Sequence, residues 1–512
     1  MKTTWTEGKI GHTGIASVVI GMCAFLGACS GDQPGPEASE QGGKGADRYG
    51  KRVPVILVVM DALDASHISH LGYERDTTPN IDAFAKDGLS FRAAFSPAPY
   101  TIAGISSLLT GRLPDSTGVT AKWHRLRDDE TPLGVVLSTK GYRTRALVNN
   151  TNGGARFGVM QGFDQATMLY EDGEPNYSLR SGEMVFVPKG KAHIPLMGEF
   201  LDDVQQDGAD TRFFFYSHML EPHSPYIADE PFRSKYIDPA YDGVFKNGDT
   251  EDLLDTINGR IVPSAEDIAA VCAMYDGHLA FADHIFGTMM ADLKARGLYE
   301  DSLIILTGDH GEAMFQHGRW GHNDHLFDEM VNVPLVIKMP GSDGPRDQIM
   351  ETLASTMDVL PTICEVLDVA PGELPLDGRS LFPVLTSGVD DDEKRALILR
   401  SHHLTADFAL RSQKGKAILL RSGEFEDGSL FFDLTKDPLE QDDLPEEDAP
   451  RRAAFLRALN THLGKVASEW REPARSTDKA EDGALLSALG YSDSEEPEEQ
   501  QAPPLPDEAA EQ

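Results

Sequence analysis

Short apolar runs alternate with amphipathic segments along most of this chain, and this alternation restricts the fold more than any other feature of the sequence. Order is predicted to begin near Val53. Apolar runs separated by helix-like segments are typical of strands that are buried on both faces. We therefore predict an α/β fold with a mostly parallel sheet between two layers of helices. The apolar and helix-like segments are residues 55–60, 80–86, 102–109, 144–148, 213–216, 303–307 and 333–339.

The pattern changes after about residue 390. Short strand candidates at residues 408–410, 417–420 and 429–432 precede an amphipathic helix at residues 450–470. We predict a catalytic domain over residues 51–390 and a small α+β subdomain over residues 391–475. Residues 476–512 hold eleven acidic residues and one basic residue, so we predict a largely disordered tail with a helical turn near residues 485–491.

Residues 1–28 are predicted to be a lipoprotein signal peptide. Lys2 and Lys9 precede an apolar run at residues 14–28 that is too short for a membrane-spanning helix. The run leads into the tetrad LGAC, which resembles the bacterial lipobox, so its last residue, Cys29, is expected to carry the lipid. A cleaved secretory signal with an incidental cysteine is the alternative.

A polar stretch follows the proposed lipid attachment site. Residues 29–50 are rich in Gly, Pro, Glu and Gln, which is typical of a flexible tether. In Gram-negative lipoproteins, a residue such as Ser30 after the cysteine suggests sorting to the outer membrane. We therefore expect a protein of the bacterial cell envelope that contacts the membrane through its lipid anchor and faces the periplasm or the cell surface.

Composition excludes several classes of protein. Hydrophobic residues make up 40% and charged residues 25%, which excludes collagen-like, fully disordered and multi-span membrane proteins. The chain has 46 Lys plus Arg against 83 Asp plus Glu, a formal net charge of −37, so we expect divalent cations and no nucleic acid as partners. Apart from Cys23 and Cys29, the cysteines are Cys272 and Cys364; a disulfide between them is left open, and no structural zinc site is expected.

Polar side chains follow two of the apolar runs. Asp61 comes directly after residues 55–60, and Asp309 with His310 follows residues 303–308. Because ligands of a doubly wound sheet bind beyond the carboxyl ends of its strands, we expect these side chains to converge on one site. Two carboxylates and one imidazole suit a hard or borderline divalent ion. A helix cap or turn is the alternative for each single Asp.

Thr101 is predicted to be the N-cap of a helix with an apolar face formed by Ile102, Ile105, Leu108 and Leu109. A hydroxyl at this position lies beside the N–H groups and the positive end of the helix dipole. It could therefore stabilise a transferred phosphoryl or sulfuryl group. A threonine cap without a catalytic role is the alternative.

A series of further short motifs along the chain bears on the family to which it is similar. They are VILVVMD (residues 55–61), TTPNID (77–82), SLLTG (107–111), GYRT (141–144), EPHSPY (221–226), GDHGE (308–312), GRWGH (318–322), DVLPT (358–362) and DGRSL (377–381). This series resembles the sulfatase family of the alkaline phosphatase superfamily over residues 53–381. FDL (432–434), DPLE (437–440) and LGY (489–491) are similar to later segments of the same family.

The resemblance implies a role for each matching residue. Asp61, Asp309 and His310 match metal ligands, and Thr101 matches both a ligand and the nucleophile. The cofactor implied is one divalent metal ion: Ca, Mn, Mg or Zn.

Several histidines are assigned in the same way. His223 and His322 match the residues that contact the transferred anion and the leaving oxygen. His218, His317 and His325 are interpreted as neighbours of the site or as surface residues. The string Lys122-Trp123-His124 is similar to a sulfatase string, but it precedes the predicted helix at residues 131–140 instead of following it, so we interpret it as a coincidence.

The chain departs from typical sulfatases around the nucleophile. Those enzymes have Cys or Ser at the Thr101 position, which is oxidised to formylglycine, and Pro, Ser and Arg where this chain has Ala103, Gly104 and Ile105. Threonine is not known as a substrate for that oxidation. A threonine nucleophile is closer to the phosphorus-handling relatives, which include phosphoethanolamine transferases, lipoteichoic acid synthases and some phosphodiesterases.

Other departures affect the charge of the site. The chain has Ala62 where typical sulfatases have a second acid, and Ser66 where many relatives have Asp. Asn149 and Asn150 lie near the position of a Lys in those relatives. We therefore expect fewer metal ligands and less positive charge than in a typical sulfatase site.

Together these features predict a metal-dependent hydrolase of phosphate, phosphonate or sulfate esters that acts through a covalent Thr101 intermediate. Phosphorus esters are favoured, because a sulfated threonine cannot expel sulfate by elimination as a formylglycine hydrate can. The substrate is expected to be an anionic ester, and the sequence predicts no particular oligomeric state. One alternative is a transferase that moves a phospho-substituent onto envelope glycans or lipids; another is a non-catalytic binding lipoprotein on the same fold.

Overall fold

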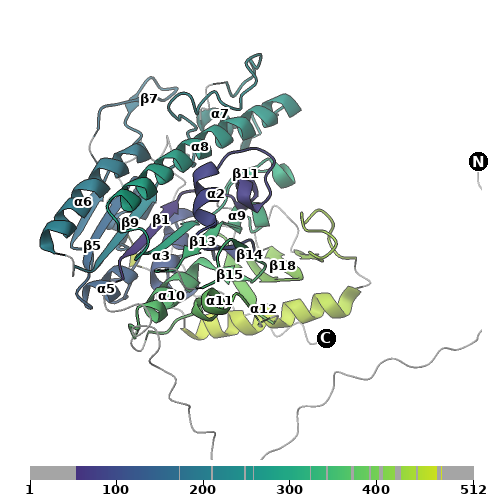
Figure 1. Cartoon of the computed structure of the whole chain (residues 1–512). Helices are drawn as coiled ribbons and strands as arrows, with labels where there is room; N and C mark the ends of the chain where they lie inside the picture. Colours follow the sequence, from purple (N-terminus) through teal and green to yellow (C-terminus); the bar gives the residue numbers. More distant parts are fainter. Residues whose placement is uncertain are drawn as a thin grey trace, which may run out of the picture. The chain divides into compact units, whose positions relative to one another are not determined.

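Figure 1 shows the computed structural model of the chain, which describes residues 53–475 except 172, 209–210, 247–249, 258, 323–324, 342–343, 371–373, 391, 393, 403–406, 421–427, 446–447 and 470–473. These residues belong to one unit that begins at Gly43. The predicted signal peptide, Cys29, the tether and the acidic tail with its helical turn lie outside the described residues. Among the helices that are described, none combines the length and the apolar character needed to cross a membrane.

An eight-stranded sheet forms the centre of the catalytic part, in the order β14-β2-β13-β10-β1-β9-β5-β6. β1 pairs in parallel with β10 and β9, and β5 continues the parallel pairing beyond β9. β13 is antiparallel to both of its neighbours. The predicted mostly parallel sheet is therefore confirmed. The strands are β1 (Val55–Met60), β2 (Leu89–Phe91), β5 (Arg143–Val148), β6 (Gln165–Met168), β9 (Phe213–Met219), β10 (Leu303–Gly308), β13 (Leu335–Lys338) and β14 (Gln348–Met350).

Helices cover both faces of this sheet, as the continuous apolar runs predict. Val55, Leu57 and Val59 of β1 lie in one hydrophobic core with α3, α5 and α10, and the other three residues of β1 lie in a second core with α2, α6 and α8. Every residue of β1 is therefore buried. The helices are α2 (Pro79–Ala85), α3 (Thr101–Thr110), α5 (Leu133–Ser138), α6 (His193–Asp207), α8 (Ala265–Ala295) and α10 (Val359–Val366).

Shorter elements lie in the connections between the strands and helices. The helices are α4 (Pro114–Thr117), α7 (Thr250–Ile257), α9 (Asp328–Val331) and α11 (Phe382–Ser387). The strand pairs are β3 (Ala94–Phe95) with β15 (Ala354–Ser355), β4 (His124–Arg125) with β20 (Ala474–Arg475), β7 (Tyr177–Ser178) with β8 (Met184–Val185), and β11 (Ala313–Met314) with β12 (Trp320–Gly321). Cys272 in α8 and Cys364 in α10 are free thiols, so the disulfide left open by the sequence is not formed.

A four-stranded antiparallel sheet follows in the C-terminal part. Its strands are β16 (Ala396–Arg400), β17 (Phe408–Ser412), β18 (Gly415–Leu420) and β19 (Gly428–Phe432), in sequential order. Helix α12 (Ala449–Glu469) packs on this sheet through Leu459 and Leu463, which share a hydrophobic cluster with Phe408 and Leu410. The predicted α+β character is confirmed, and β16 is a strand that the sequence patterns did not indicate.

Candidate active site

The candidate ligands meet at the carboxyl ends of two neighbouring strands. Met60, the last residue of β1, lies opposite Gly308, the last residue of β10, so Asp61 and Asp309 leave the sheet at the same edge. One ligand atom from each of Asp61, Asp309 and His310 lies within 4.8 Å of the other two. All three side chains are fully buried. The convergence expected from the strand ends is therefore present in the fold.

His310 is oriented with one nitrogen toward both carboxylates. Its Nδ1 lies 2.8 Å from the carbonyl oxygen of Gly311, an acceptor that fixes the ring proton on Nδ1. Its Nε2 lies 3.3 Å from Asp61 Oδ1 and 3.6 Å from Asp309 Oδ2. Burial opposes protonation of His310, but the two carboxylates outweigh it and raise the His310 pKa to about 9; a bound cation would replace the second proton, the one on Nε2.

The carboxylate oxygens fit a divalent cation. Among the described residues, Asp61 Oδ1 and Asp309 Oδ2 have no hydrogen-bond partner although both atoms are buried. Burial, and then the charge of Asp61, raise the pKa of Asp309 to about 6. Burial also opposes ionisation of Asp61, but nearby histidines, His223 first, outweigh it and hold the Asp61 pKa well below its ordinary value. Two converging buried carboxylates with unsatisfied oxygens need a positive partner, which a metal ion supplies.

The remaining oxygens of the two carboxylates are held by the protein. The backbone N–H groups of Ala62 and His310 donate to Asp309 Oδ1 at 3.2 and 2.9 Å. Asn150 Nδ2 donates to Asp61 Oδ2. Each carboxylate is thus anchored through one oxygen and presents the other to the centre of the site. Sequence reasoning noted Asn150 only as the absence of a lysine.

Ala62, whose N–H donates to Asp309, adopts an unusual backbone conformation. Its φ angle is 58°, in the left-handed region that non-glycine residues seldom adopt. The hydroxyl of Tyr275 donates to the Ala62 carbonyl oxygen at 2.7 Å and accepts from the Asp64 N–H at 3.0 Å. Tyr275 from α8 therefore holds the turn after β1, which sequence reasoning did not identify.

Thr101 lies at the beginning of α3, directly beside His310. Its Oγ1 is 3.3 Å from His310 Nε2, and the residue is buried. The predicted N-cap position is wrong by one residue: Tyr100 is the N-cap in an extended conformation, and Thr101 is the first helical residue. This difference keeps the hydroxyl at the helix N-terminus, where the first N–H groups lack partners within the helix.

Gly104 explains one departure from the typical sulfatase signature. An ideal Cβ on Gly104 would lie 2.4 Å from the carbonyl oxygen of Asp309 and 3.2 Å from Ser96 Oγ. Helix α3 therefore packs with its backbone directly against the residue that carries a candidate metal ligand. A serine at this position, as in the typical signature, would not fit without moving the two segments apart.

His223 and His322 complete the cluster. The ring of His322 lies 4.3 Å from that of His310 and 4.9 Å from that of His223, measured between centroids. His223 Nδ1 lies 2.6 Å from the Ser224 carbonyl oxygen, and His322 Nδ1 lies 3.1 Å from Glu312 Oε1. Burial lowers the pKa of both His223 and His322, so both rings are neutral near pH 7.

The structure places the three other histidines differently. His218 on β9 is fully buried, with Nε2 3.4 Å from Asp61 Oδ2 and 3.8 Å from Asp309 Oδ2, so it belongs to the site itself. His317 stacks on Phe327 at 3.8 Å and pairs with Glu329 at 2.7 Å. His325 also lies near Phe327, with centroids 6.3 Å apart. The sequence signal for His218 is its position just after the apolar run 213–216, but only the structure shows that this strand lies next to β1.

The sequence patterns indicated no role for Glu312 or Lys122. Glu312 accepts from or donates to His322, and burial raises its pKa to about 7. The charge of Lys122 contributes to the lowered pKa of His322, so Lys122 lies within electrostatic range of the site. The backbone N–H of Lys122 donates to His402 Nε2 at 3.2 Å, which connects this segment to the C-terminal part. The string Lys122-Trp123-His124, interpreted above as a coincidence, therefore contains a residue whose charge acts on His322.

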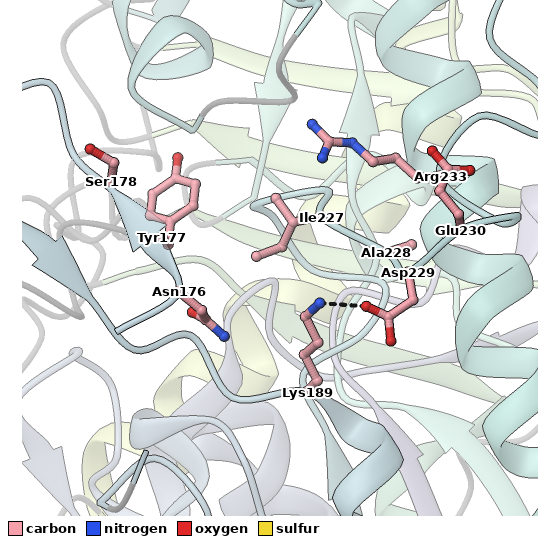
Figure 2. A pocket seen from close by; sticks show the side chains of 9 residues that line it. All are labelled: Asn176, Tyr177, Ser178, Lys189, Ile227, Ala228, Asp229, Glu230 and Arg233. Carbon is pink, nitrogen blue, oxygen red and sulfur yellow. Dashed lines mark hydrogen bonds and ion pairs between the residues drawn. The ribbon is translucent and has the colours of Figure 1, made fainter. Parts of the chain in front are cut away.

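Figure 2 shows a polar groove that is lined in part by residues 227–230. It has a volume of about 530 Å³ and is formed by residues 176–178, Lys189, residues 227–230 and Arg233. Lys189 Nζ and Asp229 Oδ1 form an ion pair of 2.6 Å across it. The groove thus combines cationic, anionic and amide groups within one opening.

Comparison with known proteins agrees with this geometry. The sequence model of the family named Sulfatase matches residues 54–369. The chain belongs to the sulfatase family. Members of the family generally use a divalent metal, and this sulfatase is an ester hydrolase in which Asp61, Asp309 and His310 form a possible metal-binding group.

Individual relatives match about four-fifths of this chain. The sulfatase is 28% identical to the multifunctional alkaline phosphatase superfamily protein PehA of Trinickia caryophylli, over 82% of this chain and 95% of that protein. It is 23% identical to the ulvan-active sulfatase of Formosa agariphila, over 83% of each chain. Its fold is similar to the phosphonate monoester hydrolase of Agrobacterium radiobacter, with a TM-score of 0.63, 21% identity and coverage of 82% of this chain and 96% of that one.

Proposed function

We propose that this sulfatase hydrolyses phosphate or phosphonate esters, and sulfate esters less readily, with one divalent ion and a covalent Thr101 intermediate. The observation that carries the proposal is the position of Thr101 Oγ1, 3.3 Å from His310 Nε2 in a cluster with unsatisfied buried carboxylate oxygens. The multifunctional relative PehA and the structural similarity to a phosphonate monoester hydrolase support activity on phosphorus esters.

Each residue has a defined part in the proposed reaction. When bound, the metal would lower the pKa of the Thr101 hydroxyl and offset charge on the transferred group. Thr101 Oγ1 attacks phosphorus while the bond to the leaving oxygen breaks. His223 Nδ1 faces a carbonyl oxygen and carries the ring proton, so Nε2 is the basic nitrogen. The hydroxyl proton passes to the neutral pair of His223 and His322, whose ring centroids lie 4.9 Å apart, and the pair returns a proton to the leaving oxygen.

The second half of the reaction regenerates the threonine. Water attacks phosphorus of the phosphothreonine, its proton passes to the same pair of histidines, and the bond to Thr101 Oγ1 breaks. Phosphate or phosphonate leaves, and Thr101 recovers its proton. A sulfated threonine lacks the elimination route by which a formylglycine hydrate expels sulfate, so it has to await attack at sulfur. The loss of this route favours phosphorus esters over sulfate esters.

An activity panel tests the proposal. Protein stripped with EDTA is assayed with 4-nitrophenyl phosphate, bis(4-nitrophenyl) phosphate, 4-nitrophenyl phenylphosphonate and 4-nitrophenyl sulfate after addition of Mn, Ca, Mg or Zn. We expect metal-dependent release of nitrophenol from at least one phosphorus ester at a higher rate than from the sulfate. Product formation that requires an added acceptor alcohol would instead indicate a transferase.

Metal content provides the matching control. Asp61→Asn and Asp309→Asn are each expected to lose stoichiometric metal in elemental analysis, whereas Asp242→Asn on the surface is expected to retain it. Wild-type protein that binds metal but hydrolyses none of the esters would indicate a non-catalytic binding lipoprotein. Equal metal content in all three variants would remove the metal site from the proposal.

The cellular location belongs to the same proposal. The tetrad that ends in Cys29 supports a lipid-anchored protein of the bacterial envelope, and the polar composition of residues 29–50 supports a tether. An anchored hydrolase at this location would act on anionic esters of the periplasm or the cell surface.

A further inference from the structure

The hairpin formed by β11 and β12 carries His322 at its base and His317 at its tip. Its strands pair through residues 313–314 and 320–321, so Glu312 and His322 leave the two strands side by side. These strands of two residues each form a sheet of their own. Because so short a hairpin is at best marginally stable alone, the contacts of its tip affect how firmly His322 is held.

The backbone at the tip of this hairpin is strained. Phe315 and His317 have φ angles of 69° and 51°, in the left-handed region that residues other than glycine seldom adopt. Such conformations persist only where the surrounding structure holds them in place. The tip therefore depends on side-chain contacts with other parts of the molecule.

His317 joins the tip to α9 and to the C-terminal part. Its ring stacks on Phe327, with centroids 3.8 Å apart and 6° between the ring planes. Nδ1 lies 2.7 Å from Glu329 Oε1 in α9, and Nε2 lies 2.9 Å from the carbonyl oxygen of Glu440. Both partners are oxygen acceptors, and an imidazole donates from both nitrogens only when it carries two protons. The geometry therefore favours the imidazolium form of His317.

A neutral ring would lose one of these two contacts. The amide nitrogen of Gln441 lies 3.2 Å from His317 Nε2 and donates to the Leu439 carbonyl oxygen at 2.9 Å. Without its proton, Nε2 can accept from this amide but can no longer donate to the Glu440 carbonyl oxygen. Gln441 is an exposed side chain, so it fixes the ring less firmly than a backbone carbonyl does. Loss of one proton therefore loosens the tip.

The charges around His317 favour its protonated form. Burial opposes the charge, but the ion pair with Glu329 outweighs burial and raises the pKa of His317 above its ordinary value of 6.5. Glu440 acts in the same direction. A cavity of about 240 Å³ lies beside the ring. The charged groups on the elements that surround His317 are Glu329 and Asp328 of α9, Glu440 of the C-terminal part, Asp64 of the turn after β1, and Arg411 and Lys416, which pair with Asp328.

We propose that His317 is a positioning residue for His322, because its doubly protonated ring clamps the tip of the hairpin to α9 and the C-terminal part. The C-terminal part thereby acts on the active site through the hairpin. The effect on catalysis rests on the proposed function of His322, whereas the clamp itself does not. As the pH rises through the His317 pKa, the hairpin loosens and His322 is held less firmly.

Amide hydrogen exchange of the hairpin tests the clamp without any turnover. Protection of a peptide of residues 313–322, relative to the same peptide when unfolded, is measured from pH 6 to pH 9. We expect wild-type protection to fall about tenfold or more over this range, because a hydrogen bond from a charged donor is lost. His317→Gln should be less protected at pH 6 and should show no such fall. His284→Gln, which changes an exposed histidine of α8, is the matched control and should behave as wild type.

Two further measurements separate the charge of His317 from its packing. Glu329→Gln keeps an acceptor oxygen but removes the charge, so the fall in protection should move to lower pH by about one unit. In wild-type protein labelled with ¹⁵N-histidine, both nitrogens of His317 should be protonated at pH 6, with the signals assigned by their loss in His317→Gln. A ring with a single protonated nitrogen at pH 6, or equal protection of wild type and His317→Gln at every pH, would overturn the clamp.

Turnover tests the link from the clamp to His322. With any ester that wild-type protein hydrolyses, His317→Gln should lower kcat at pH 6, and the size of this effect should shrink at pH 9, where the wild-type clamp is also loose. An unchanged kcat in a variant whose hairpin exchanges faster would overturn the positioning of His322. Absence of hydrolysis by wild-type protein would contradict the proposed function alone, because the exchange experiment needs no substrate.

Discussion

At the scale of single residues, the hydroxyl of Thr101 can serve as a helix-terminal group or as a nucleophile, and substitution separates the two. Because Thr101 is the first helical residue and not the N-cap, Thr101→Ala is expected to cost about 1 kcal/mol of stability at most, but several orders of magnitude in turnover. Thr101→Ser keeps an attacking oxygen and should retain measurable phosphoesterase activity. Rates and urea unfolding of both variants are the measurements, with mass spectrometry of trapped enzyme to locate the adduct. Near-normal turnover of folded Thr101→Ala would make a metal-bound water the attacking group.

Gly104 is a second residue whose size matters. Gly104→Ala would place a Cβ 2.4 Å from the Asp309 carbonyl oxygen, so helix α3 or the turn after β10 must move. We expect a loss of about 1–3 kcal/mol in unfolding free energy and a weaker affinity for the metal, measured by denaturation and by metal titration. Gly464→Ala in α12, where a Cβ would meet nothing within 4 Å, is the control and should retain metal affinity. Unchanged metal affinity in Gly104→Ala would show that the close contact does not position Asp309.

At the scale of secondary-structure elements, helix α8 contacts the loop that carries His223. His278 Nδ1 lies 3.1 Å from the Pro222 carbonyl oxygen, and burial lowers the pKa of His278 to about 3. The unfolded chain takes up a proton at its ordinary pKa of 6.5, whereas the folded protein does not until about pH 3. The contribution of His278 to stability is therefore complete above pH 6.5 and is lost by about 1.4 kcal/mol per pH unit as the pH falls.

Comparison of wild-type protein with His278→Gln isolates this contribution from that of the buried acids. Urea unfolding of both proteins at pH 7.5, 6.0 and 5.0 is the measurement. The stability difference between them should move in favour of the variant as the pH falls, because glutamine does not titrate. A difference that stays constant over this range would mean that His278 titrates equally in both states.

The C-terminal sheet is joined to α9 by a buried ion cluster. Lys416 on β18 is fully buried, with Nζ 2.7 Å from Asp328 Oδ1 and 2.8 Å from Glu440 Oε1. Lys416→Met leaves the buried Glu440 without its cation, so we expect a loss of about 3 kcal/mol in unfolding free energy. Lys246→Met at the surface is the matched control. Equal denaturation midpoints for the two variants would show that the cluster does not stabilise the junction.

At the scale of the whole molecule, the proposed lipid anchor determines where the enzyme acts. Cys29→Ala removes the only thiol at the end of the predicted signal peptide, so lipid attachment becomes impossible. We expect the variant to appear in the soluble fraction or to retain its signal peptide, as measured by cell fractionation and intact mass. Processing and membrane partitioning identical to wild type would contradict an anchor at Cys29.

Much of the architecture and the candidate ligand set could be predicted from the sequence, for a local physical reason. A strand covered by helices on both faces must be apolar throughout, so β1 and β10 are visible as continuous runs with Asp61 and Asp309 directly after them. Chain order also restricts which strand ends meet, because parallel strands place their carboxyl ends at one edge. The sequence by itself therefore indicated the sheet, the candidate ligands and the helix that begins near Thr101.

Contacts between segments that are distant along the chain were decided only by the tertiary structure. His218 reaches both carboxylates because β9 lies next to β1, and Gly104 must be small because α3 packs against Asp309. Tyr275 holds the turn at Ala62 across more than two hundred residues. The groove likewise combines β7, Lys189 and the loop after β9. Side-chain patterns report the burial of one segment, whereas a pocket depends on which segments pack together, and that depends on the whole core.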